Sequence, residues 1–133
     1  MKLSTFAIIT SLLGFGFGAA LIVVPGKFIG MYGMDMNTSG ILMARYLGGA
    51  NLFLGMIFWS YSQVAATAKS WPKLLTFSLV YFLAQIAITI NEILNVGANA
   101  MGWATLALFA LLALGSVYFL SQTKKAAAMV IGK

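Results

Sequence analysis

The polar side chains able to do chemistry in this 133-residue chain are few, and most fall inside long apolar stretches. One set recurs at spacings of seven, four and three residues: Ser78, Gln85, Thr89 and Glu92. That spacing places the four side chains on one side of a helix, with Tyr81 alongside. Because polar groups are costly in hydrocarbon, we expect this side to face a protein interior or a wet cavity.

A neighbouring apolar stretch adds Arg45 and Asn51 to this possible functional cluster. If the two stretches form antiparallel helices, Arg45 and Glu92 both lie within ~8 Å of one membrane surface, at a rise of ~1.5 Å per residue. Asn51 and Gln85 are then both near the midplane. We therefore predict an Arg45–Glu92 pair, with Asn51 close to Gln85. Such a pair either fixes helix register or makes Glu92 a protonatable or cation-binding carboxylate. Alternatively, both charges reach the headgroups independently.

Composition excludes most other chemistry. The chain is 62% hydrophobic, with eight Lys or Arg, two Asp or Glu, and neither Cys nor His. A soluble domain is far more charged, and a disordered chain far less hydrophobic. Without Cys and His there is no thiolate site, no disulfide and no imidazole base. We predict that the protein is not an enzyme, and the sequence specifies no cofactor.

Methionines gather in the stretch 25–39. Met31, Met34 and Met36 could bind Cu(I), because soft thioether sulfur suits that ion. Methionine also fills irregular gaps between helices. Since no His or Cys accompanies these sulfurs, we favour the packing interpretation and predict no metal site.

Charge-free runs over 3–26, 46–68, 74–91 and 93–123 are long enough, or nearly so, to cross a bilayer. They predict helices at about 4–24, 40–62, 74–95 and 101–121, joined by an outer interfacial loop at 25–39 in which Thr38 or Ser39 caps the second helix. The first run could instead be a cleaved signal peptide, but it is longer than a typical one, so we favour a retained helix. The expected fold is an all-α, four-helix transmembrane bundle of up-down-up-down topology, a single domain over 1–133.

Charge placement predicts the orientation of this multi-pass membrane protein. In a four-span topology one side carries Lys2, Lys69, Lys73, Lys124, Lys125 and Lys133. The opposite side carries only Lys27 and Arg45. The positive-inside rule therefore places both termini in the cytoplasm. The net charge of +6 follows from this topology, so we predict no nucleic-acid partner.

Small residues predict close helix packing. Gly14 and Gly18 form a small-x-x-x-small pair in the first helix, and Gly48 and Gly55 lie on one seam of the second. The fourth helix is rich in Ala. Three small-residue faces indicate a tightly packed bundle and suggest contacts with other membrane subunits or with further copies of the chain.

The pattern of Pro25, Tyr32-Gly33, Ala44-Arg45 and the glycine seam that follows resembles small four-helix bacterial integral membrane proteins of uncharacterised function, over residues 20–60. The resemblance implies a four-helix bundle and a shared Arg position, and no activity. We expect a non-catalytic small membrane protein, an accessory subunit of a membrane complex or a homo-oligomer that is embedded in the lipid bilayer. The alternatives are a small ion or solute transporter that uses the Arg45–Glu92 pair and the polar stripe, and a lipid- or quinone-handling enzyme.

Overall fold

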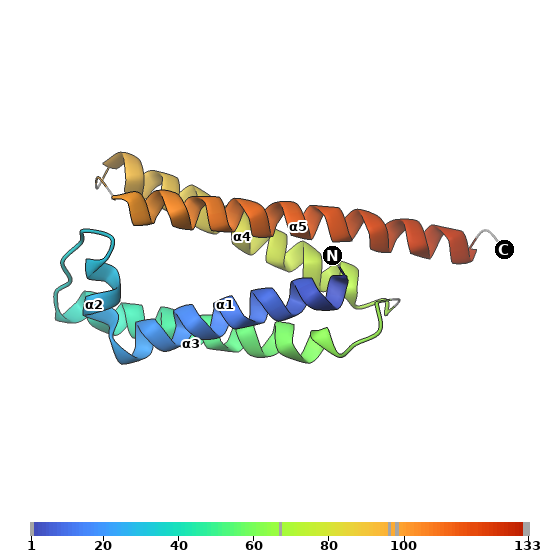
Figure 1. The fold of residues 1–133 in the computed structure, drawn as a ribbon, viewed down its shortest axis with the longest axis horizontal. Helices are drawn as coiled ribbons and strands as arrows, with labels where there is room; N and C mark the ends of the chain where they lie inside the picture. The colour runs from blue at the N-terminus through green and yellow to red at the C-terminus, as the bar shows by residue number, and fades with distance from the viewer. Residues whose placement is uncertain (1, 67, 96, 98, 132–133) are drawn as a thin grey trace. The chain divides into compact units, whose positions relative to one another are not determined.

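The computed structural model describes residues 2–66, 68–95, 97 and 99–131, with side chains to Thr123. Every regular element in this part of the chain is a helix (Figure 1). The elements are α1 (Leu3–Val23), α2 (Pro25–Gly30), α3 (Thr38–Ser62), α4 (Trp71–Asn95) and α5 (Ala100–Ile131).

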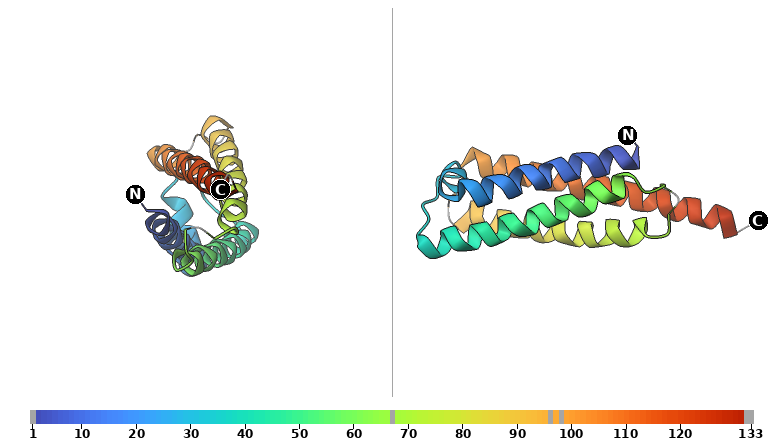
Figure 2. Two further views of the ribbon diagram at one scale, coloured as in Figure 1. Left: turned by 90° about the vertical axis from the view of Figure 1, so that its right-hand side faces the viewer. Right: turned by 90° about the horizontal axis from the view of Figure 1, so that it is seen from below.

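Four of these helices are long and apolar enough to cross a membrane: Leu3–Val23, Thr38–Ser62, Trp71–Asn95 and the Ala100–Thr123 portion of α5. α1 and α3 run antiparallel, as do α4 and α5 (Figures 1 and 2). The prediction of an all-α protein with four long, antiparallel apolar helices is therefore confirmed.

The chain divides into two compact units, each of which is described by itself. The first consists of Met1–Gln63 with Ala98–Met101, and contains α1, α2, α3 and the first residues of α5. The second consists of Val64–Gly97 with Gly102–Lys133, and contains α4 and the rest of α5. Each unit therefore has two long antiparallel helices at its centre.

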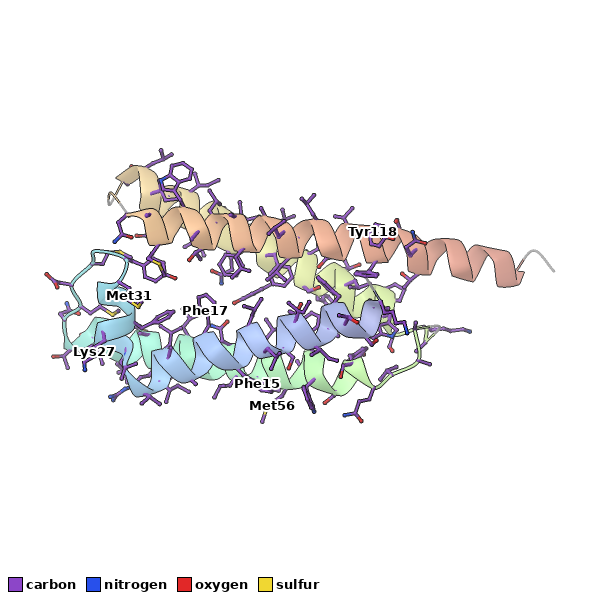
Figure 3. The ribbon with its side chains drawn as sticks, viewed as in Figure 1. Phe15, Phe17, Lys27, Met31, Met56 and Tyr118 are labelled. Atoms are coloured by element: carbon purple, nitrogen blue, oxygen red, sulfur yellow. The ribbon has the colours of Figure 1, made fainter. Side chains whose placement is uncertain are left out.

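The structure differs from the expected loop at 25–39, because Pro25–Gly30 forms the short helix α2. Proline lacks a backbone N–H and disfavours helical geometry in the preceding residue, so α1 ends at Val23. Proline is well suited to the first turn of a new helix, where its missing donor has no partner to lose. Phe28 then packs edge-to-face on Phe17, which Figure 3 labels, and on Tyr32, with ring centroids 5.6 and 5.9 Å away.

The helix starts and ends also differ from expectation, by a few residues for α3 and α4 and by ten at the end of α5. α3 begins at Thr38 because Asn37, and not Thr38 or Ser39, is the cap: its Oδ1 accepts the Gly40 N–H at 2.8 Å. α4 begins at Trp71, three residues early, with Pro72 tolerated in the first turn. α5 runs on to Ile131, since the run of Lys and Ala after the span favours helix and includes no breaker.

Candidate functional site

In the first unit, the α1 residues at the α3 contact form one continuous buried stripe. Its members recur every three or four residues: Leu3, Ala7, Ser11, Gly14, Gly18 and Leu21. The facing stripe on α3 consists of Ala44, Gly48, Gly55 and Phe58. We call this contact the glycine seam. Figure 3 shows α1 and α3 side by side, with Phe15 of α1 labelled.

The four glycines predicted to pack helices all lie in this seam, and each is too close to its neighbours to carry a side chain. A Cβ on Gly14 would meet the Gly55 Cα at 2.9 Å and the Asn51 backbone oxygen at 3.0 Å. On Gly18 it would meet the Gly48 oxygen at 2.9 Å, and on Gly48 the Gly18 oxygen at 2.9 Å. On Gly55 it would meet the Phe15 ring at 2.9 Å. The small-residue pattern here brings two backbones of the same chain together.

Gly16 and Gly49 lie within the same helices but outside the seam. A Cβ added to Gly16 or to Gly49 would meet nothing within 4 Å among the described residues. Gly16 lies on an exposed α1 stripe with Leu12 and Ala19, and Gly49 lies on α3 between the exposed rings of Tyr46 and Phe53. Packing within the first unit therefore does not explain these two glycines.

Ser11 is an unusual member of the seam. Its side chain is fully buried, and its Oγ has no hydrogen-bond partner among the described residues. The neighbouring Thr10, also buried, satisfies its hydroxyl by donating to the Phe6 carbonyl at 2.9 Å. A buried hydroxyl without a partner costs free energy, so Ser11 is a weak point of the seam.

In the second unit, α4 contacts α5 through Ser78 and Phe82, which belong to a buried stripe of the same three-and-four spacing. Trp71, Leu75, Ser78 and Phe82 are buried. The Ser78 and Ser116 Oγ atoms are 3.5 Å apart, and the Phe82 and Phe109 ring centroids 6.3 Å apart. We call this contact the α4–α5 seam. Each serine hydroxyl also bonds a carbonyl of its own helix, Leu75 for Ser78 and Leu112 for Ser116.

The remaining polar residues of the predicted α4 stripe continue the same face toward the C-terminal end of the helix. Gln85, Thr89 and Glu92 are half-buried. The Thr89 hydroxyl donates to the Gln85 backbone carbonyl at 2.7 Å, and the Gln85 side chain shares a hydrogen bond with Tyr81. The polar stripe therefore lies on the packed face of α4. Ser78, at its start, is buried, and the residues from Gln85 onward are half-buried.

Arg45 and Asn51 belong to the first unit, and Glu92 and Gln85 to the second. Arg45 is exposed on α3, and Asn51 donates from Nδ2 to the Leu47 carbonyl at 3.0 Å. The Arg45–Glu92 and Asn51–Gln85 pairs therefore stay predictions.

The segment after α2 is held by Asn99, which directly precedes α5. Its Nδ2 donates to the Met31 carbonyl at 2.8 Å, and its Oδ1 accepts the Met101 N–H at 2.9 Å. Met31 is exposed, while Met34 and Met36 are half-buried. The Met36 methyl group lies beside Gly40, 3.2 Å from where a Cβ would be. Copper binding at these sulfurs stays untested.

No group of three or more His, Cys, Asp or Glu side chains that could hold a metal ion occurs among the described residues. Comparisons with known proteins found no matching family model, no matching curated protein and no matching solved structure. The class of the protein therefore rests on its own helices. It is a small four-span membrane protein whose apolar helices contact the lipid bilayer.

Proposed function

We infer that the protein is a small non-catalytic membrane protein that works as an accessory subunit of a membrane complex or as a homo-oligomer. One observation supports this proposal: Gly16 and Gly49 lie on exposed helix faces with open space beside them. Glycine weakens a helix by about 1 kcal/mol relative to alanine. In membranes, glycine is favoured where another helix approaches closely. An approaching helix from outside the chain accounts for both positions.

The chain lends itself to crosslinking because it contains no cysteine. Gly16→Cys introduces a single thiol on the exposed α1 stripe, and we expect oxidation in native membranes to give one discrete adduct. Leu111→Cys, on the exposed large-residue face of α5, is the matched control and should give none. Equal adduct formation at both positions, or none at Gly16, would contradict the proposal.

The orientation is also proposed, with both termini in the cytoplasm. The bias of lysines toward the side of the termini and of the 63–73 loop supports it. A glycosylation acceptor placed in the 95–100 connector should be modified, whereas one fused to the C-terminus should not. The reverse result would overturn the assignment.

The resemblance of residues 20–60 to small four-helix bacterial membrane proteins of uncharacterised function is consistent with the proposed role and adds no activity to it. A transporter is the second candidate, and the observation that favours it is the continuous polar stripe on the packed face of α4. In that case Glu92→Gln abolishes flux in proteoliposomes while the chain still folds, and unchanged flux rules the transporter out.

A further inference from the structure

Arg45 is the only charged residue in the sequences of α1 and α3, and it is exposed on α3. The side chains around it on the helix surface are large and favour lipid: Leu42, Met43 and Tyr46 are 47%, 62% and 65% exposed. Because a charge is costly beside hydrocarbon, a guanidinium in these surroundings needs an anionic partner.

The glycine seam fixes the level of Arg45 along the helices. A Cβ on Gly48 would meet both the Gly18 oxygen, at 2.9 Å, and the Leu21 Cβ, at 3.0 Å. Since α1 and α3 are antiparallel and rise equally per residue, three residues back along α3 match about three residues forward along α1 (Figure 1). Arg45 is therefore level with the last turn of α1, which ends at Val23. This is the end of a membrane span, where hydrocarbon gives way to headgroups.

The first unit supplies no carboxylate at this level. Its sequence includes only Asp35, which precedes α3 and lies outside the spans. The membrane itself supplies an anion there, the phosphate group of a phospholipid. A guanidinium can bind phosphate through two parallel N–H···O bonds, and the long arginine side chain can extend toward the headgroups. Tyr46, the next residue, adds a hydroxyl of the kind that is common at membrane interfaces.

We propose that Arg45, with the Tyr46 hydroxyl beside it, binds the phosphate of a phospholipid in the leaflet at this end of α3. The exposed apolar side chains of Leu42 and Met43 offer a surface for the acyl chains, which a free phosphate ion lacks. The ligand is therefore a lipid headgroup. The site belongs to the first unit and does not depend on the accessory role proposed above.

The test uses the full chain, freed of lipid in detergent and titrated with phosphatidylglycerol, with bound lipid counted by native mass spectrometry. We expect saturable binding of a first lipid, and no displacement by inorganic phosphate. Arg45→Gln should weaken this binding by about tenfold or more. Arg45→Lys should lose less, because lysine keeps the charge but not the two parallel bonds. Tyr46→Phe should also weaken binding, by a smaller factor than Arg45→Gln.

Lys27→Gln is the matched control, because Lys27 is an exposed cation of the same unit that lies outside the four spans. Its lipid binding should equal that of the wild type. Equal binding by the wild type and Arg45→Gln would overturn the proposal, as would equal losses in Lys27→Gln and Arg45→Gln. Displacement by inorganic phosphate would overturn the choice of a lipid. Lipid binding that appears only in Glu92→Gln would overturn the proposal in favour of the predicted Arg45–Glu92 pair.

Discussion

Replacing Gly14 by alanine tests the glycine seam with a single methyl group. The new Cβ would lie 2.9 Å from the Gly55 Cα, 3.0 Å from the Gly55 nitrogen and 3.0 Å from the Asn51 backbone oxygen. All three neighbours are backbone atoms, which cannot turn aside as the end of a side chain can. Carbon atoms prefer about 3.5–4.0 Å, so α1 and α3 must separate by roughly 0.6–1 Å at this level.

The loss of stability in Gly14→Ala follows from that separation. A gap of ~0.5–1 Å forfeits about a quarter to a half of the dispersion well for each contact across it. Overpacking of this kind costs about 1–3 kcal/mol. Alanine also stabilises the helix by up to about 1 kcal/mol relative to glycine, which partly offsets this cost. Gly16→Ala is the internal control for the isolated chain in mixed micelles, because it gains the same propensity and its Cβ meets no other atom of the first unit. The difference between the two variants therefore isolates the contact, at about 1–3 kcal/mol.

The assay is unfolding by SDS in mixed micelles, followed by tryptophan fluorescence, with Trp59 reporting from α3. We expect Gly14→Ala to unfold at a lower SDS fraction than the wild type, and Gly16→Ala at the same or a higher one. If Gly14→Ala proves as stable as Gly16→Ala, the close approach of α1 and α3 is wrong.

Two further predictions concern the ends of the helices. Asn99→Ala removes the cap of α5, which should lower the stability of the first turn by about 0.5–2 kcal/mol and speed amide hydrogen exchange at Met101. Asn99→Asp keeps the capping oxygen and should preserve the protection of that amide. Unchanged exchange in Asn99→Ala would count against the cap. Trp71→Phe removes the bond from the buried indole Nε1 to the Ala65 carbonyl (3.0 Å), worth about 0.5–1.5 kcal/mol, and should lower the SDS midpoint. Trp103→Phe, at an exposed position, should leave the midpoint unchanged, and equal effects of the two changes would refute the assigned role of Trp71.

Features encoded within one helix could be predicted from the sequence. The four spans follow from the length of the charge-free runs, and the spacing of Gly14 and Gly18 already puts both glycines on one face. The α4 stripe shares the face that packs on α5, because its three-and-four spacing continues that of Trp71 and Leu75. In these cases the periodicity of a helix is enough to predict which residues share a face.

Features that depend on distant contacts could not be predicted. α2 depends on Phe28 packing against Phe17, and the segment after it depends on Asn99, 68 residues away from Met31 in the chain. The end of α5 was misplaced for a different reason. A membrane surface limits a span but does not end a helix, so hydropathy marks the end of the span near Thr123 and not the end of the helix.

The central claim is that exposed helix faces of this protein pack against other membrane helices, and the stoichiometry of the native chain tests it most directly. The protein is extracted from its own membrane in polymer-bounded native nanodiscs without detergent, and the mass of the protein content is measured. We predict a discrete mass above that of a single 14.2 kDa chain, which Gly16→Leu reduces. A single chain alone in every disc, unchanged by Gly16→Leu, would contradict the account.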